Sequence, residues 1–264
     1  MLKDYIASLG SVAVAFSGGV DSTLLLRVAH DVLGDKAIAV TISSSLFPKR
    51  ELAEAEAFCR ENCINHVLLP IDELAIDGFR NNPPDRCYLC KRELFTRLLA
   101  VAREHGLAHV IEGSNMDDLG DYRPGLKAID ELGIKSPLRH AGLTKQEIRD
   151  ISRELGLPTW EKPSYACLAS RFVYGETITP EKLIMVERAE NLLLELGFRQ
   201  MRVRIHGNLA RIEVMPEDFG KAVALRERIH SELKGFGFTY AALDLAGYRT
   251  GSMNAPLRSQ SINP

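Results

Sequence analysis

The feature that most constrains this 264-residue chain is a glycine-containing hexapeptide, Ser17–Ser22, which reads Ser-Gly-Gly-Val-Asp-Ser. It follows Val12–Phe16, an apolar run that predicts a buried strand, and precedes Asp21–Leu33, where apolar residues recur at helical spacing. A helix N-terminus offers unpaired backbone N–H groups and a favourable dipole to an anion. The hexapeptide therefore indicates a polyphosphate site between a strand and a helix.

Every specified residue of this phosphate loop has a use at such a site. Gly18 and Gly19 let the backbone turn tightly and approach a ligand, and Ser17 and Ser22 offer hydroxyl donors. Asp21 either caps the helix or holds Mg²⁺, which prefers oxygen ligands. The alternative is a simple strand-to-helix turn with a serine or aspartate cap. The loop is not a Walker A motif, because no Gly-Lys-Ser/Thr follows it.

The loop resembles the Ser-Gly-Gly-x-Asp-Ser loop of the PP-loop ATP pyrophosphatases. That resemblance implies that ATP is cleaved between its α and β phosphates to give an adenylated intermediate. The superfamily includes NAD synthetases, asparagine synthetases, tRNA thiolases and deazaguanine synthases, so the loop alone leaves the substrate open.

Strand-like and helix-like patterns alternate through the first 160 residues. This alternation predicts an α/β fold with a parallel, doubly wound sheet. The expected strands are Val12–Phe16, Ala37–Ile42, His66–Ile71 and His109–Glu112, and the expected helices are Asp21–Leu33, Pro48–Cys63, Cys90–His105 and Thr144–Leu155.

The pattern changes after residue 175, and a second, smaller α+β domain is expected there. We place the first domain at residues 1–165 and the second at residues 175–264. Irregular loops, which are often functional in a compact domain, are expected at Asp77–Asp85 and Pro163–Thr179. The second domain should hold a helix at Pro180–Leu196, a hairpin of Met201–Ile205 and Arg211–Val214, a helix at Pro216–Lys234 and a strand at Phe238–Leu245.

Composition narrows the class of protein. The formal net charge of −2 lacks the basic excess that is typical of nucleic-acid binding. No apolar run approaches the roughly 18 residues that span a bilayer, and Met1–Gly10 lacks the apolar stretch of a signal peptide. We therefore expect a cytoplasmic protein with neither nucleic-acid nor membrane partners. Its five cysteines then favour metal or catalytic roles over disulfides.

A second loop, Gly113–Asp118, follows the expected strand at His109–Glu112. Ligands of open α/β sheets bind at the carboxyl ends of strands, so this loop should lie beside the phosphate loop. Gly113 and Asp117 are candidates for the same site. Asp117 and Asp118 could hold Mg²⁺ or cap a helix.

Three cysteines could form one metal site. Cys87 and Cys90 form a Cys-x-x-Cys pair, a common ligand arm for zinc or iron–sulfur clusters. Cys167, from a distant loop, could complete a three-thiolate site that leaves one iron of a cubane open. Arg171, four residues later, would favour the thiolate of Cys167.

Other arrangements of the cysteines stay open. Cys59 and Cys63 are spaced by four residues on an expected helix, where small buried hydrophobes are ordinary. Alternatively, these two could join Cys87 and Cys90 in a four-thiolate zinc site and leave Cys167 alone. Cys87 and Cys90 could also be unliganded thiols.

Four segments together resemble the LarE sulfurtransferases, and the likeness spans nearly the whole chain. The most specific element is Ala-Cys-Leu-Ala-Ser-Arg around Cys167. The segments are Ser17–Ser22, Cys87–Lys91, Ser164–Arg171 and Gly247–Asn254.

The resemblance implies an enzyme of nickel-pincer nucleotide biosynthesis. It would use ATP to adenylate a carboxylate of pyridinium-3,5-biscarboxylic acid mononucleotide and convert it to a thiocarboxylate. In one kind of family member a single cysteine, matched by Cys167, gives up its sulfur and becomes dehydroalanine. In another kind, three cysteines, matched by Cys87, Cys90 and Cys167, bind a [4Fe-4S] cluster that carries an extra sulfide. The Cys-x-x-Cys pair favours the second kind.

The resemblance also assigns residues. Asp21, Arg171 and Cys167 would be catalytic, and Arg202 and Arg249 would bind the substrate phosphate. Glu190 and Glu213 would lie near a divalent ion, although each charged residue alone could be a solvated surface charge. A homo-oligomer is implied as well.

Three rival functions remain. A tRNA thiolase also combines a PP-loop with cysteines, and an amide-forming ligase would use ammonia in place of sulfur. A non-enzymatic adenine-nucleotide sensor would bind ATP without releasing pyrophosphate.

Overall fold

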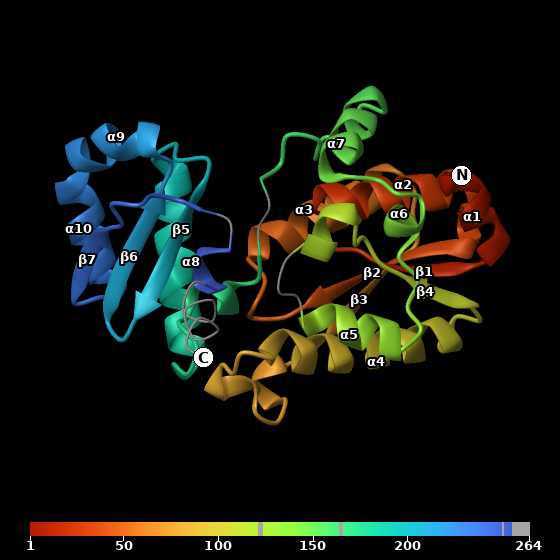
Figure 1. The fold of residues 1–264 in the computed structure, drawn as a ribbon, viewed down its shortest axis with the longest axis horizontal. Helices are drawn as coiled ribbons and strands as arrows, with labels where there is room; N and C mark the ends of the chain where they lie inside the picture. Colours follow the sequence, from red (N-terminus) through yellow and green to blue (C-terminus); the bar gives the residue numbers. More distant parts are fainter. Residues whose placement is uncertain (121–123, 164–165, 250, 255–264) are drawn as a thin grey trace, which may run out of the picture. The chain divides into compact units, whose positions relative to one another are not determined.

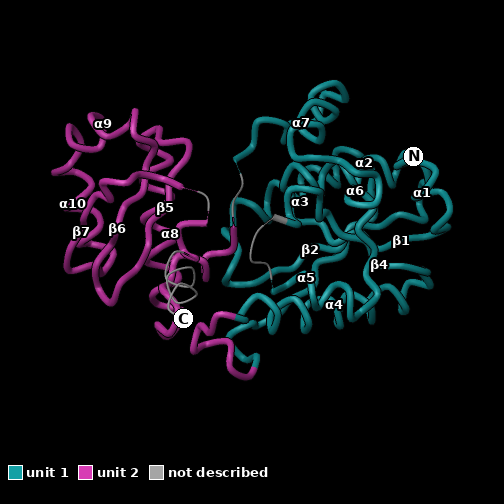
Figure 2. The backbone as a smooth tube through the Cα atoms, viewed as in Figure 1, with its two compact units in different colours: residues 1–76, 85–165 teal, residues 77–84, 166–264 magenta. Residues whose placement is uncertain are grey.

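The structure is a computed structural model that describes residues 1–120, 124–163, 166–249 and 251–254. The chain forms two compact units (Figure 2). The first unit comprises residues 1–76 and 85–165, and the second comprises residues 77–84 and 166–264.

The first unit is built on four parallel strands in the order β3-β2-β1-β4 (Figure 1). All strands run the same way because a helical segment separates each from the next. The predicted parallel α/β sheet is confirmed. The strands are β1 (Val12–Ala15), β2 (Ala37–Ser43), β3 (His66–Pro70) and β4 (His109–Ile111).

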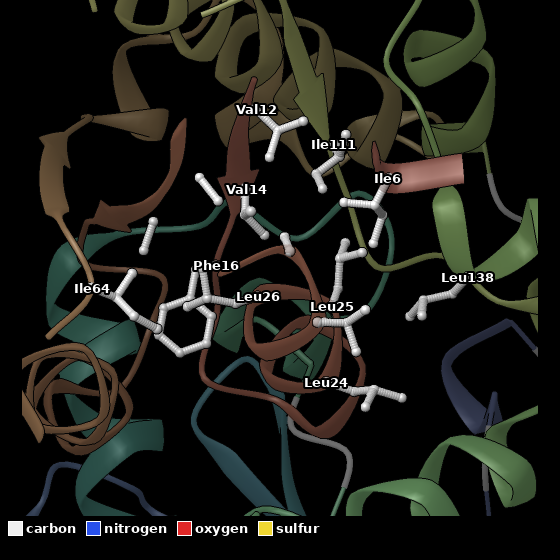
Figure 3. Packing of buried hydrophobic residues seen from close by; sticks show 14 of the residues in the cluster. Ile6, Val12, Val14, Phe16, Leu24, Leu25, Leu26, Ile64, Ile111 and Leu138 are labelled. Carbon is white, nitrogen blue, oxygen red and sulfur yellow. The ribbon is translucent and has the colours of Figure 1, made fainter. Parts of the chain in front are cut away.

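Helices cover both faces of this sheet, as a doubly wound fold requires. Because side chains alternate along a strand, Val12 and Val14 of β1 pack into one core and Ala13 packs into the other. The first core contains α2, and Figure 3 shows Leu24, among others, packed in it. The other core contains α4 and α5. The helices are α1 (Leu2–Leu9), α2 (Val20–Leu33), α3 (Lys49–Glu61), α4 (Arg86–Glu104), α5 (Pro124–Glu131), α6 (Pro137–His140) and α7 (Lys145–Glu154).

Three of these helices are absent from the sequence prediction: α1, α5 and α6. Each has eight residues or fewer, too short for a helical period to stand out from chance.

The second unit contains a three-stranded mixed sheet in the order β5-β6-β7. The β5–β6 hairpin was predicted and is antiparallel, whereas β7 pairs with β6 in parallel. The predicted single helix at Pro216–Lys234 is wrong. It is interrupted at Leu225, whose φ of −92° and ψ of 7° separate two helices. The elements are β5 (Met201–His206), β6 (Leu209–Val214), β7 (Tyr240–Leu243), α8 (Pro180–Glu195), α9 (Phe219–Ala224) and α10 (Arg226–Gly235).

Residues 77–84 pack with the second unit, although their place in the chain suggested the first domain. Asn82 is fully buried, and its side-chain amide donates to the carbonyls of Phe172 (3.3 Å) and Val173 (2.6 Å). The backbone carbonyl of Asn82 accepts from the backbone N–H of Gly175 at 3.0 Å. Such a loop-to-loop link leaves no periodic signal in a sequence.

No helix in the described part of the chain is long and apolar enough to cross a membrane.

Cys63 occupies a left-handed position just after α3. Its φ is +55°, and it is exposed rather than buried, so the predicted core position is wrong for this cysteine. A left-handed residue at a helix end is normally glycine, because a Cβ there costs about 1–2 kcal/mol. The helix therefore ends in a conformation that its own residue disfavours.

We expect Cys63→Gly to stabilise the first unit. Relief of the left-handed strain exceeds the extra chain entropy of glycine, for a net gain of about 0.5–1 kcal/mol. Urea unfolding would measure the gain. Cys63→Ala is the control, because it keeps the Cβ and should give no gain. Equal midpoints for the two variants would contradict the strain argument.

Candidate functional site

The loops after β1 and β4 meet at the carboxyl end of the sheet, within the first unit, and line a cavity of about 430 Å³. The approach is close: a Cβ at Gly113 would lie 3.2 Å from both the Cβ of Asp21 and the backbone nitrogen of Ser22. A side chain at this position would therefore push the neighbouring loop away by a few tenths of an ångström. The predicted adjacency of the loops is what the structure shows.

The phosphate loop leads directly into α2. Gly18 adopts a left-handed φ of +68°, and Gly19 is the N-cap of the helix. The hydroxyl of Ser22 accepts from the backbone N–H of Ser17 (3.3 Å), donates to the Gly19 carbonyl (3.2 Å) and lies 3.1 Å from the Ser17 hydroxyl. The loop is thus held by its own serines, and the helix N-terminus faces a site suited to an anion.

Asp21 lies in the first turn of α2 and lines the cavity. One carboxylate oxygen accepts from the side-chain amide of Asn115 at 3.1 Å, and the other pairs with the ammonium of Lys145. Lys145 is the first residue of α7 and is absent from the sequence prediction, because nothing local marks it as a partner of Asp21. A carboxylate already paired with a cation in this position is suited to receive Mg²⁺ in its place.

The two aspartates of the second loop have separate tasks. Asp117 accepts from the backbone N–H of Lys145 at 2.8 Å, so it caps the start of α7. Asp118 accepts from the backbone N–H of Asn115 at 3.1 Å and lines the cavity. Asp118, rather than Asp117, is therefore the one of the pair that faces the cavity.

The rest of the cavity has one polar end and one apolar wall. The buried carboxylate of Glu112, also missed from sequence, accepts from the hydroxyls of Ser114 (2.8 Å) and Ser136 (2.5 Å). A cavity lined by both apolar side chains and a polar phosphate loop suits a planar base joined to phosphates. The apolar wall is formed by Val40, Ile42, Phe47, Leu52, Leu94, Phe95 and Leu98.

Cys87 and Cys90 lie in the first turns of α4, and both are half-buried. The neighbouring Arg86 is almost fully buried, and its guanidinium contacts the sulfur of Cys87 at 3.8 Å. This contact holds the Cys87 sulfur at the start of α4. Arg86 was not identified from sequence, since an arginine before a cysteine is unremarkable without its burial.

The structure does not assemble the rival four-cysteine zinc site. Cys59 packs in the core on the α2 face of the sheet, and burial raises the pKa of its thiol to about 12. Cys87 and Cys90 lie on α4, which packs on the opposite face. Within the described ranges, no three histidine, cysteine, aspartate or glutamate side chains gather around a common point.

Cys167 lies in the second unit and is half-buried. It immediately precedes a 3₁₀ turn that contains Arg171. The guanidinium of Arg171 donates to the carbonyls of Ala166 (2.6 Å) and Cys167 (3.1 Å) and to the hydroxyl of Ser170 (2.8 Å). Arg171 thus fixes the backbone around Cys167. Ser164 and Tyr165, which belong to the same predicted motif, lie outside the described residues.

The rest of the Arg171 guanidinium forms a two-point pair with Glu190 of α8, at 2.8 and 2.7 Å. Burial disfavours the charged form of both residues. The attraction and hydrogen bonds between them outweigh burial, so the pKa of Arg171 is raised and the pKa of Glu190 is lowered. Glu190 also accepts from the backbone N–H of Val203 at 3.0 Å. This carboxylate is engaged by protein donors on both oxygens.

We expect Arg171→Met to destabilise the second unit by about 3–5 kcal/mol, because it leaves Glu190 charged and buried without its partner. Chemical unfolding would measure the loss. Arg188→Met is the control, since Arg188 is an exposed residue of α8, the helix that carries Glu190. Similar losses in the two variants would contradict a structural role for the pair.

The same pair predicts a dependence of stability on pH. The folded pKa of Glu190 lies below its unfolded value, so the stabilisation is complete above about pH 4.5 and is lost as pH falls through the folded pKa. Unfolding midpoints measured between neutral and acidic pH should therefore fall at the acidic end. Glu190→Gln should flatten this dependence, and an unchanged slope would contradict it.

Arg202 is a further charged group beside this pair. It is buried, donates to the Met201 carbonyl at 2.6 Å and lies over the ring of Tyr248 at 5.3 Å. Burial and the charge of Arg171 lower its pKa. A buried guanidinium with like-charged neighbours is a favourable site for an anion.

Glu213 is fully buried and is held by other arginines. Arg204 pairs with both of its oxygens at 3.1 and 3.0 Å, Arg211 contacts one at 3.0 Å, and Ser252 donates to it as well. Arg249 is exposed after β7. Thr250 of the same predicted motif lies outside the described residues.

Comparisons with known proteins give several findings. The chain is 41% identical over 262 residues to pyridinium-3,5-bisthiocarboxylic acid mononucleotide synthase of Lactiplantibacillus plantarum, covering 99% of this chain and 94% of that protein. It is 47% identical over 260 residues to an uncharacterized protein of Synechocystis sp., covering 97% of this chain and 96% of that protein. It is 30% identical over 239 residues to an uncharacterized protein of Methanocaldococcus jannaschii, covering 90% of this chain and 91% of that protein. The NAD synthase family matches residues 1–98, which contain the phosphate loop.

Proposed function

The chain belongs to the LarE family of PP-loop enzymes, and from that membership we propose that it converts a carboxylate of pyridinium-3,5-biscarboxylic acid mononucleotide to a thiocarboxylate with the use of ATP. The observation that carries the proposal is the 41% identity to the Lactiplantibacillus synthase over nearly the whole chain. The phosphate loop and cavity of the first unit support it, because they suit a nucleotide.

ATP would lie with its phosphates at the N-terminus of α2 and its base against the apolar wall of the cavity. Ser17, Gly18, Gly19 and Ser22 would contact the phosphates. Asp21 would hold Mg²⁺, whose charge would assist departure of pyrophosphate. The ammonium of Lys145, which pairs with Asp21 in this structure, would then be available to bind the phosphates.

The reason for using ATP is chemical. A carboxylate is a poor electrophile, and its oxygen is a poor leaving group. Attack of the carboxylate on the α-phosphate releases pyrophosphate and gives an acyl adenylate. Sulfur can then displace AMP, so that one carbon–oxygen bond is exchanged for a carbon–sulfur bond.

The source of sulfur is proposed to be a [4Fe-4S] cluster held by Cys87, Cys90 and Cys167. Cys87 and Cys90 fit, because residues three apart lie on one side of a helix and Arg86 contacts the Cys87 sulfur. Cys167 would come from the second unit. When bound, such a cluster would supply a sulfide at its open iron. The alternative is that Cys167 gives up its own sulfur.

Arg202 and Arg249 are proposed to bind the substrate phosphate, and the burial of Arg202 beside Arg171 supports an anion there. The role of Glu190 and Glu213 at a divalent ion stays a prediction. It would require both carboxylates to leave the arginines that now hold them. A cytoplasmic homo-oligomer also stays a prediction, and light scattering would measure the assembly.

The test is release of pyrophosphate and AMP from ATP with and without the dicarboxylate nucleotide. We expect pyrophosphate and AMP to be released only when the dicarboxylate nucleotide is present. Binding of ATP without release would favour a nucleotide sensor instead. Amide formation with ammonia in sulfide-free buffer would favour a ligase, and a salt-sensitive shift of tRNA would favour a tRNA thiolase.

A further inference from the structure

Lys162 connects the phosphate loop to α3 through one partly buried ammonium. Its Nζ donates to the Gly18 carbonyl at 3.0 Å and contacts the carboxylates of Glu51 and Glu54 at 2.6 and 2.5 Å. Only 12% of its side chain is exposed. Glu51 also lines the cavity. Lys162 therefore lies beside the nucleotide site without belonging to the loops that build it.

The backbone around Lys162 is held from a second side by α7. Arg149 donates to the carbonyls of Trp160 (2.5 Å) and Lys162 (2.9 Å). The guanidinium of Arg153 lies over the Trp160 ring at 5.6 Å. The segment Trp160–Lys162 is thus anchored by cations on α7 and by its own lysine on the phosphate loop.

We propose that Lys162 is a positioning residue that transmits occupancy of the phosphate loop to the segment Trp160–Lys162; this inference rests on the proposed ATP site. A polyphosphate brings negative charge to the loop and competes with Glu51 and Glu54 for the ammonium. Arg50 also contacts both carboxylates, at 3.3 and 3.9 Å, so they keep a cation when Lys162 turns toward the phosphates.

Trp160 provides the readout, because it is the single tryptophan of the chain and lies two residues before Lys162. The full-length protein is titrated with Mg²⁺ and an ATP analogue that has a methylene group between the α and β phosphates. We expect Trp160 emission to change on saturation in the wild type. Lys162→Met should bind the analogue about tenfold more weakly, as loss of one charge-assisted contact implies, and show no emission change when saturated. Lys162→Arg should restore much of the response.

Lys182→Met is the matched control, because Lys182 forms an equally short ion pair with Glu176 (2.5 Å) in the second unit. Its Trp160 response should be that of the wild type. Glu54→Gln, at an exposed carboxylate, tests the same contact with little risk to folding and should tighten analogue binding a few-fold.

Two results would overturn the inference: a full Trp160 response in saturated Lys162→Met, or no response in a wild type that binds the analogue by calorimetry. Absence of analogue binding in the wild type and in Lys182→Met would instead refute the ATP site itself. The two failures are therefore distinguishable.

Discussion

Asp21→Asn is expected to lower pyrophosphate release about a hundred- to a thousandfold while the fold is retained. The substitution keeps the shape of the side chain but removes the charge that would hold Mg²⁺. The structural loss is small, because the pair with Lys145 is partly exposed and such pairs contribute about 0–1 kcal/mol. Pyrophosphate release and urea unfolding, measured on the same preparation, separate the two effects.

The matched control for this variant is Asp31→Asn. Asp31 lies on the same helix, pairs with Arg27 at 2.9 Å and is exposed. Its removal should leave pyrophosphate release within about twofold of the wild type, as is usual for a surface pair. Full activity in Asp21→Asn would remove Asp21 from the site, and equal losses in both variants would indicate a general defect of α2.

Cys167→Ala is expected to abolish thiocarboxylate formation and to leave adenylation largely intact. The phosphate loop and cavity lie in the first unit, whereas Cys167 lies in the second. Both proposed sulfur sources require this thiolate, so the loss of product should be complete whichever operates. Product is followed by mass spectrometry and adenylation by pyrophosphate release.

The control is Cys63→Ala, which removes an exposed thiol of the first unit and should keep full product yield. Normal yield in Cys167→Ala would exclude Cys167 from sulfur transfer. Dehydroalanine at position 167 in the spent wild-type protein would favour the sacrificial route. Intact Cys167 with iron and labile sulfide would favour the cluster.

The elements of the first unit were largely predictable from sequence, because its strands are short apolar runs bounded by turn residues. The phosphate loop was predictable because Ser17–Ser22 is contiguous, so all of its functional groups are visible in one short stretch of sequence. The adjacency of Gly113 to the loop followed from parallel topology, in which strand ends meet at one edge.

The sequence did not reveal which residues from distant segments contact the residues of the site. Lys145 is 124 residues from Asp21, and no local pattern joins them. Arg86 was inconspicuous until its burial beside Cys87 was known. Glu190 and Glu213 were identified as possible ion ligands from family likeness, but whether a carboxylate binds a metal or an arginine depends on its neighbours in space.

The most direct test of sulfur transfer is to incubate the anaerobically purified protein with ATP, Mg²⁺, sulfide and pyridinium-3,5-biscarboxylic acid mononucleotide and to identify the product by mass. We expect a thiocarboxylate, with one sulfur in place of one oxygen, formed together with AMP and pyrophosphate. Formation of AMP and pyrophosphate without any sulfur-containing product, under conditions in which Asp21→Asn is inactive, would contradict it.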